Sequence, residues 1–218
     1  MQKILTLTVL VAMCSVLAIA ADDHPKVETF LGFTYLRANS ATDVPAFSAN
    51  GGTGQLAVNF NKYLGFVMDI GAVHNGNISD QHLDSTFVNY NFGPRVSIRH
   101  GRVTPFFNIL FGATRASTSI AVNAIPVGGT PSNPIYLPGS PTPIPPNTPV
   151  SLRAVHSQTA FSMPVGGGID IKINKYMSFR PVELDYFLTR LQNIRNLNDN
   201  NQNNLRYMAG VNFTFGAQ

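Results

Sequence analysis

The chain has 218 residues, of which 44% are apolar and only 12% are charged, and its formal net charge is +4. A soluble domain usually has about 25% charged residues, so this composition is unusual for a protein surrounded by water. The Lys and Arg residues are scattered along the chain, which argues against nucleic acid as a partner. No apolar run after the N-terminal segment reaches about eighteen residues, which excludes a helical membrane protein.

The N-terminal segment has the pattern of a secretory signal peptide. Lys3 precedes an apolar run over residues 4–17, and Ala18-Ile19-Ala20 then supplies small residues at the −3 and −1 positions of a cleavage site. The apolar run is too short for an uncleaved membrane-spanning helix. We therefore expect a signal peptide at residues 1–20, cleavage after Ala20, and one folded domain over residues 21–218.

The single cysteine, Cys14, lies inside this segment. A lipid-attachment site would need a small residue before the cysteine, and Met13 stands there instead. Cleavage after Ala20 would remove the only thiol. The exported protein would then have no disulfide and would depend on packing or on a membrane for its stability.

Eight stretches of the remaining sequence alternate between apolar and polar residues, which is typical of β-strands. Most have ten or more residues, close to the roughly 9–11 that a tilted strand needs to cross a bilayer. In chain order they are Val27–Leu36, Gly54–Asn61, Tyr63–Val73, Ser85–Arg99, Arg102–Ser117, Gln158–Ile173, Tyr176–Leu188 and Asn204–Phe215.

The two faces of these stretches differ in kind. In the last stretch Leu205, Tyr207 and Val211 share one face, whereas Arg206 and Asn212 share the other. The same division recurs in the third, fourth and sixth stretches, where the charges lie with the small residues. A soluble ligand-binding barrel would have the opposite arrangement. The pattern therefore predicts an all-β fold: an eight-stranded, antiparallel, up-and-down transmembrane β-barrel with a polar interior and an apolar exterior.

The connections between these stretches alternate in length. Three are tight hairpins, in which Asn and Gly suit the backbone of a turn, at Asn61-Lys62, His100-Gly101 and Asn174-Lys175. Four are long and cover about residues 38–53, 74–84, 118–157 and 189–203. This alternation predicts a bacterial outer-membrane protein, with the long loops outside the cell and both termini in the periplasm.

Two features of these connections are distinctive. The loop at about 118–157 holds nine of the fifteen prolines, and no charged residue occurs between Arg115 and Arg153. Proline resists regular structure, so we expect an extended surface loop, with a loop that binds an extracellular partner as the alternative. The first tight turn, Asn61-Lys62-Tyr63, is also echoed in the third as Asn174-Lys175-Tyr176. The echo indicates one hairpin solution used twice.

The charges that face the predicted lumen are the candidate functional residues. Buried charges need partners, so the acids and bases should pair inside a narrow barrel. The set consists of the acidic Glu28, Asp69, Asp170, Glu183 and Asp185 and the basic Arg95, Arg99, Lys172 and Arg206. Arg180 is a further candidate, although a bulge at Pro181 would leave the face of Arg180 undefined. The near balance favours a structural plug over a gate or a narrow ion pathway, since an eight-stranded barrel has room only for side chains.

The sequence predicts no catalytic, cofactor-binding or metal site. His74 and His82 share one predicted loop with Asp80 and Asp84, but their spacing matches no recognised metal motif. The pair His156-Ser157 is the weak remaining hint of a barrel enzyme that acts on lipid, because it has no placed carboxylate beside it.

The end of the chain resembles the small outer-membrane β-barrel family, which includes OmpA-like transmembrane domains and opacity-type, porin-like surface proteins. The resemblance rests on residues 180–186, on residues 203–215 and on Gly93-Pro94-Arg95. It implies a monomer that contacts outer-membrane lipid and lipopolysaccharide and is inserted by the barrel-assembly machinery. We expect no cofactor, and a structural or surface-interaction role through the long loops, including an unidentified extracellular ligand. The alternatives are a narrow channel for ions or small solutes and a lipid-modifying enzyme.

Overall fold

The computed structural model describes residues 24–39, 46–78, 83–124, 134–136, 139, 141–143, 150–192 and 199–216. The predicted signal peptide at residues 1–20 lies outside this range, and so do Asp80 and His82. Within the described residues, no helix is both long and apolar enough to cross a membrane.

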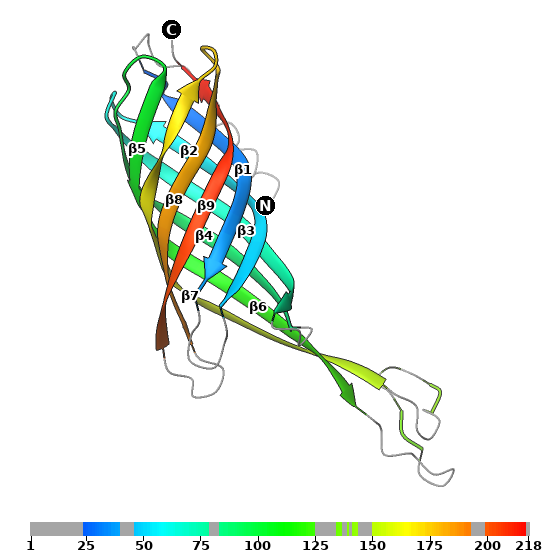
Figure 1. Ribbon diagram of the computed structural model, residues 1–218. Coiled ribbons are helices and arrows are strands. Elements are labelled where there is room, and N and C mark those ends of the chain that lie inside the picture. The colour runs from blue at the N-terminus through cyan, green and yellow to red at the C-terminus, as the bar shows by residue number, and fades with distance from the viewer. Residues whose placement is uncertain are drawn as a thin grey trace, which may run out of the picture.

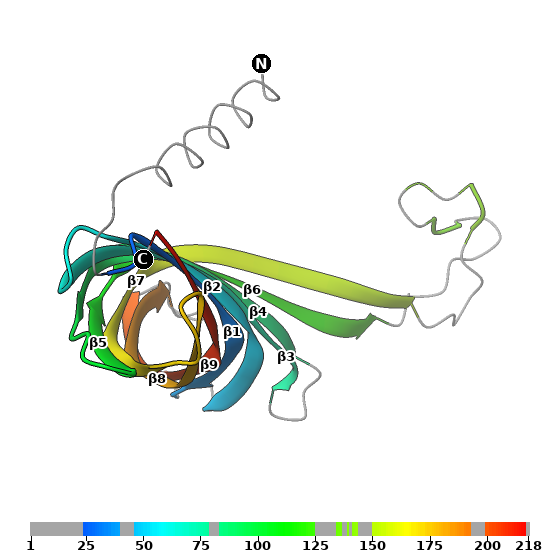
Figure 2. The ribbon, with the colours of Figure 1, turned by 90° about the horizontal axis from the view of Figure 1, so that it is seen from above.

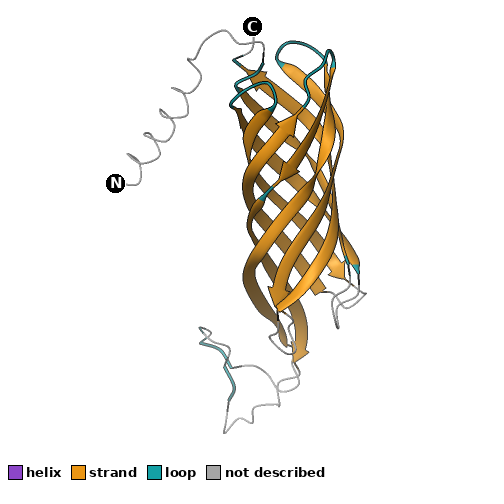
Figure 3. Cartoon of the chain, turned by 90° about the vertical axis from the view of Figure 1, so that its left-hand side faces the viewer, coloured by secondary structure: helices purple, strands orange, loops and turns teal. Residues whose placement is uncertain are grey.

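The described residues form nine strands, and short turns connect them at one end of the molecule (Figures 1 and 3). All eight predicted stretches appear as strands, the fifth of them in two pieces. The strands are β1 (Val27–Ala38), β2 (Phe47–Asn59), β3 (Leu64–Ile78), β4 (Leu83–Ser97), β5 (Val103–Ile109), β6 (Phe111–Ala124), β7 (Val150–Lys172), β8 (Met177–Gln192) and β9 (Asp199–Phe215).

The strands close into a ring. Apart from β5 and β6, which both pair with β4 and with β7, each strand pairs antiparallel with its neighbour in the chain, and β1 also pairs with β9, so that the first and last strands meet. The last of these pairs reaches from Val27↔Phe215 to Arg37↔Leu205. The view along the axis shows the ring directly (Figure 2). The prediction of an eight-stranded up-and-down barrel is confirmed, with β5 and β6 together acting as one strand.

The division between β5 and β6 is a local interruption at Leu110. The pairing register with β4 and with β7 is the same on both sides of this residue, so the strand does not slip. Pro94 on β4 and Pro164 on β7 lie beside the interruption, and a proline has no N–H to donate to the ladder. The Leu110 N–H still donates to the Pro164 carbonyl at 2.9 Å, which keeps the strand in place.

Three short turns and both ends of the described chain lie at one end of the barrel, which we call the turn end. Gly101 has a φ of 64°, a conformation that suits glycine. The other two turns instead use an Asn side chain as a backbone mimic. Asn61 Oδ1 accepts from the N–H groups of Tyr63 and Leu64, and Asn174 Oδ1 accepts from the Tyr176 N–H, each at 2.8 Å.

The strands extend further than predicted at the opposite end, which we call the loop end. The connection expected over 118–157 is shorter, because β6 and β7 stay paired from Thr118↔His156 to Ala124↔Val150. These two strands project beyond the ring as a two-stranded ribbon (Figure 2). The expected connections over 38–53, 74–84 and 189–203 shorten as well. At this end the regular alternation lapses, as in the continuous apolar run Ile120-Ala121-Val122 of β6, while backbone pairing continues.

The predicted faces are confirmed. Leu205 is 50% exposed on the outer wall, whereas its neighbour Arg206 is 1% exposed inside the barrel. The interior is not uniformly polar, however. An apolar cluster fills the lumen toward the loop end, and it consists of Leu36, Ala49, Val73 and Phe187, with Phe47 and Phe87 packed against it. The charges therefore lie between this apolar cluster and the turn end.

Candidate functional site in the barrel lumen

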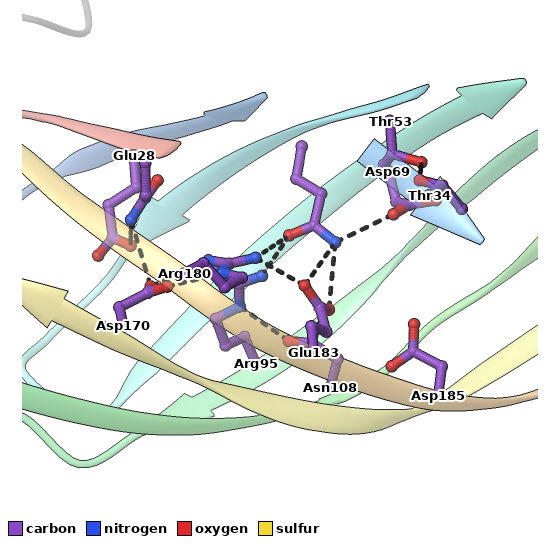
Figure 4. A network of polar contacts seen from close by, with 12 residues as sticks. Glu28, Thr34, Thr53, Asp69, Arg95, Asn108, Asp170, Arg180, Glu183 and Asp185 are labelled. Carbon is purple, nitrogen blue, oxygen red and sulfur yellow. Dashed lines mark hydrogen bonds and ion pairs between the residues drawn. The ribbon is translucent and has the colours of Figure 1, made fainter. Parts of the chain in front are cut away.

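Six polar side chains meet in the middle of the lumen and form what we call the central cluster. They come from five strands around the ring, and apart from the pair Arg180–Glu183 on β8 their contacts join residues on different strands. Figure 4 shows how these side chains point toward one another. All six are at most 5% exposed, and they are Gln55, Arg95, Asn108, Asp170, Arg180 and Glu183.

Arg180 is the main cation of the central cluster. Its Nε and Nη2 donate to the two carboxylate oxygens of Asp170 at 2.6 and 2.9 Å, a bidentate arrangement. Its Nη1 donates to Glu183 Oε2 at 2.7 Å. Two-point contact between guanidinium and carboxylate is both strong and directional. One buried arginine thus compensates two buried acids.

Gln55 connects the charges on opposite sides of the lumen. Its Oε1 accepts from Arg95 at 2.7 Å and from Arg180 at 2.8 Å. Its Nε2 donates to Asp69 at 3.0 Å and to Glu183 at 3.2 Å. A neutral amide can satisfy cations with one end and anions with the other. Gln55 therefore joins four charged side chains without adding charge.

Among the described residues, Arg95 is held without a direct contact to an acid. Its Nε donates to Asn108 Oδ1 at 2.8 Å, and Asn108 Nδ2 donates onward to Glu183 at 2.8 Å. The guanidinium carbon also lies 4.4 Å from the ring centre of Phe106. The charge of Arg95 is thus neutralised through an amide relay, and its flat face packs on an aromatic ring.

Two phenylalanines sandwich Arg180. Its guanidinium carbon lies 4.2 Å from the ring centres of both Phe30 and Phe106. Desolvated cation–π contacts of this kind contribute on the order of 2 kcal/mol. The rings fill the lumen above and below the guanidinium plane, so the polar contacts at its edge are closed off from water.

A bulge in β8 explains why Arg180 and Glu183 share the lumen. The two residues are three positions apart, so a regular strand would place them on opposite faces. The register between β8 and β9 shifts between Arg180 and Glu183, at the position of Pro181. The bulge anticipated at Pro181 is present, and it turns Arg180 inward, where it is fully buried.

A second group of charges lies toward the loop end. Arg206 donates to Asp69 at 2.9 Å and to Asp185 Oδ2 at 2.7 and 3.0 Å. Asp69 also accepts from Asn89 at 2.5 Å. Because Gln55 also contacts Asp69, this group is continuous with the central cluster.

A third group lies at the turn end. Arg99 donates to Glu28 at 2.6 Å, and its other terminal nitrogen donates to the Lys62 carbonyl at 2.8 Å. Glu28 also accepts from Asn59 at 2.8 Å and from Asn212 at 3.0 Å. This pair is the outermost one, since the Arg99 side chain is 14% exposed.

The structure places Lys172 apart from these groups. Its side chain is exposed at the turn end, where it lines a cavity of about 210 Å³ together with Glu28 and Arg99. Across the described part of the chain, Lys172 forms no ion pair with an acid. The other eight candidate residues are brought into the three groups, and each of the five carboxylates contacts an arginine.

Glycine creates the space that this packing needs. A Cβ built on Gly71 would lie 2.5 Å from Thr53 Oγ1 and 2.7 Å from Asn89 Oδ1, the residue that donates to Asp69. A Cβ on Gly54 would instead meet only ordinary contacts, the nearest at 3.5 Å from Leu31 Cδ2.

We therefore expect Gly71→Ala to destabilise the barrel by about 1–3 kcal/mol, because it overfills a packed interior. Gly54→Ala is the matched control and should leave stability almost unchanged. Urea unfolding of both variants in lipid vesicles measures the difference. Equal stability of the two variants would contradict the packing described for the lumen.

The remaining candidates from the sequence lie on the outside or beyond the ring. His74 Nδ1 is 3.4 Å from Asp84 Oδ1 and 3.0 Å from Thr86 Oγ1, on the neighbouring strands β3 and β4. Among the described residues no group of three or more His, Cys, Asp or Glu side chains could hold a metal ion. His156 pairs with Thr118 on the projecting ribbon, away from the lumen groups.

Sequence reasoning missed the neutral members of the site. Gln55, Asn108 and Phe106 form contacts as important as those of the charges, but each is a common residue on an inward face. The alternation of β2 and β5 could have shown that these three side chains face the lumen, but it could not have shown which residues they contact.

Comparisons with known proteins agree with this architecture. The family model described as the outer membrane protein beta-barrel domain matches residues 6–217. No curated protein matches the chain. Ail, the attachment invasion locus protein of Yersinia pestis, has a similar structure with a TM-score of 0.56 and 13% identity, covering 88% of this chain and 99% of its own. Neisserial surface protein A also gives 0.56, with 11% identity and coverage of 89% and 100%. The chain therefore belongs to the outer-membrane β-barrel family, which places it in the bacterial outer membrane.

Proposed function

We propose that this protein is a non-enzymatic, non-conducting barrel that acts at the cell surface through its loop end. The observation that carries the proposal is the closed lumen. Arg180, Gln55 and Glu183 span the interior with hydrogen bonds of 2.7–3.3 Å, and the apolar cluster defined above fills the lumen beyond them. An ion would have to break buried contacts and then cross an apolar section, and both steps oppose conduction.

The loop end supports a surface role. The β6–β7 ribbon extends past the rim of the barrel, so it can present the proline-rich segment between Ala124 and Val150 to the outside. A rigid scaffold that presents variable loops is a common arrangement in binding proteins. We propose that the loop end is extracellular and that the turn end faces the periplasm.

An anionic sugar is the ligand class that we would test first. A structure of Yersinia pestis Ail in complex with the heparin analogue sucrose octasulfate is similar to this chain, with a TM-score of 0.51, 13% identity and coverage of 87% and 99%. In the present protein Arg37 and Arg115 are exposed on the outer wall near the loop end, where they could meet such a ligand.

Planar-bilayer recordings test the closed lumen. We expect no reproducible conductance step from the refolded full-length protein, or from a variant in which residues 125–149 are replaced by a short turn. A step that survives this replacement would instead support the alternative, a narrow channel through the barrel.

Protease treatment of whole cells tests the orientation. We expect cleavage between Ala124 and Val150 in intact cells, whereas the three short turns should be protected until the outer membrane is opened. Protection of the 125–149 segment in intact cells would contradict the proposed surface role.

A further inference from the structure

We propose that the cavity at the turn end is a binding site for a small phosphate-type anion. Its volume is about 210 Å³, and it opens at the end of the lumen that carries the short turns. A water molecule occupies roughly 30 Å³ of liquid, so the cavity has room for a phosphate group and a few waters. The site is separate from the loop end, and it does not depend on the surface role proposed above.

The acids that line this cavity are already compensated. Glu28 accepts from Arg99 at 2.6 Å and from two Asn side chains. Asp170 accepts the bidentate contact of Arg180 at 2.6 and 2.9 Å. Glu28 therefore has an arginine partner of its own, whereas Asp170 shares Arg180 with Glu183. Three cations, Arg99, Lys172 and Lys175, line the cavity against these two acids.

The cations at the opening are not compensated. Lys172 and Lys175 line the same cavity, and within the described residues neither has an acidic partner. The ammonium group of Lys175 has three hydrogen-bond donors. Its contact with the Tyr176 ring, at 4.9 Å from the ring centre, is a cation–π interaction and leaves these donors available to an anion. Two ammonium groups beside Arg99 make an opening with net positive charge, which suits an anion that carries one or two charges.

The cations are held on an ordered frame. Lys172 is the last residue of β7, where it pairs with Ser178. The turn that follows is fixed by the Asn174 side chain and by Thr214 Oγ1, which donates to the Lys175 carbonyl at 2.9 Å. A site on rigid elements loses less entropy on binding than a site on a mobile loop.

The repeated turn provides a matched control. Lys62 has the same Asn-Lys-Tyr context and the same distance of 4.9 Å to its tyrosine ring, but it does not line the cavity. Lys62 lies on the turn between β2 and β3, on the opposite side of the eight-stranded ring from Lys175. General attraction of anions to turn lysines would involve Lys62 as much as Lys175.

The test is a titration of the refolded full chain with inorganic phosphate in maltoside micelles, which contain no phosphate of their own. We expect saturable binding by calorimetry that K172Q/K175Q weakens about tenfold, since two partly screened charge contacts are lost. K62Q should bind like the unaltered protein. Heat-modifiable gel mobility confirms that each variant is folded.

Unchanged affinity in folded K172Q/K175Q, or an equal loss in K62Q, would overturn the proposal. Phosphatidylglycerol added to the micelles then identifies the source of the anion. If this lipid displaces inorganic phosphate, the headgroup of a neighbouring lipid occupies the site. If it does not, the site takes a free phosphate compound from the periplasm, and either result supports a phosphate site at the turn end.

Discussion

Replacing Arg180 with alanine should destabilise the barrel by about 3–5 kcal/mol, the loss expected when one partner of a buried charge pair is removed. Asp170 and Glu183 would both lose their arginine partner in the buried lumen, and Phe30 and Phe106 would lose the cation between their rings. Urea unfolding in lipid vesicles, followed by circular dichroism and gel mobility, measures the change.

Two further variants identify the origin of this loss. Arg99→Ala removes the outermost pair, but Glu28 keeps its bonds from Asn59 and Asn212, so we expect a much smaller effect. The double change of Arg180→Met with Asp170→Asn removes one charge of each sign and leaves Glu183 as the anion that faces Arg95 through Asn108, so it should regain most of the stability. If the double variant is as unstable as Arg180→Ala, packing of the guanidinium rather than its charge determines the loss.

The strands and their faces follow from the sequence because two different surroundings impose a strict period of two. Lipid outside excludes charge, and a narrow lumen inside excludes large apolar side chains at most positions. The residue types of neighbours such as Leu205 and Arg206 are therefore enough to predict which one faces lipid and which one faces the lumen. The same argument fails toward the loop end, where the regular alternation lapses, and the predicted strands were accordingly too short there.

The pairing inside the lumen could not be predicted in the same way. Gln55 contacts residues on β3, β4 and β8, and these contacts depend on how far each strand is staggered around the ring. The stagger is a property of the closed barrel and leaves no local pattern in the sequence. The sequence could suggest which charges face inward, but it could not show that a neutral amide joins them.

The bulge at Pro181 lies between these two cases. A proline inside an expected strand indicates that the ladder is irregular there, and this left the face of Arg180 undefined. The size of the consequence came only from the structure. One shifted residue places a fully buried cation between two acids, and without it Glu183 and Asp170 would lack their common partner.

Placing a charge on the outer wall should be nearly as harmful as removing one from the lumen. Phe92 lies near the middle of the outward apolar residues of β4, is 54% exposed, and its ring centre is 6.2 Å from that of Phe66. We expect Phe92→Arg to cost about 2–4 kcal/mol in lipid vesicles, the range for a basic residue at the middle of the bilayer.

Ser157→Arg is the matched control, because Ser157 is also exposed but lies on β7 beyond the apolar band. A new charge there remains in water and should change stability by less than about 0.5 kcal/mol. Phe92→Leu separates the loss of the ring from the gain of the charge. If Phe92→Arg costs no more than Phe92→Leu, the wall around Phe92 does not face lipid, and the membrane boundary must lie elsewhere on the barrel. A large loss of stability at Phe92 with none at Ser157 would instead place the boundary of the bilayer nearest the loop end between these two positions, so that the ribbon formed by β6 and β7 lies outside the bilayer.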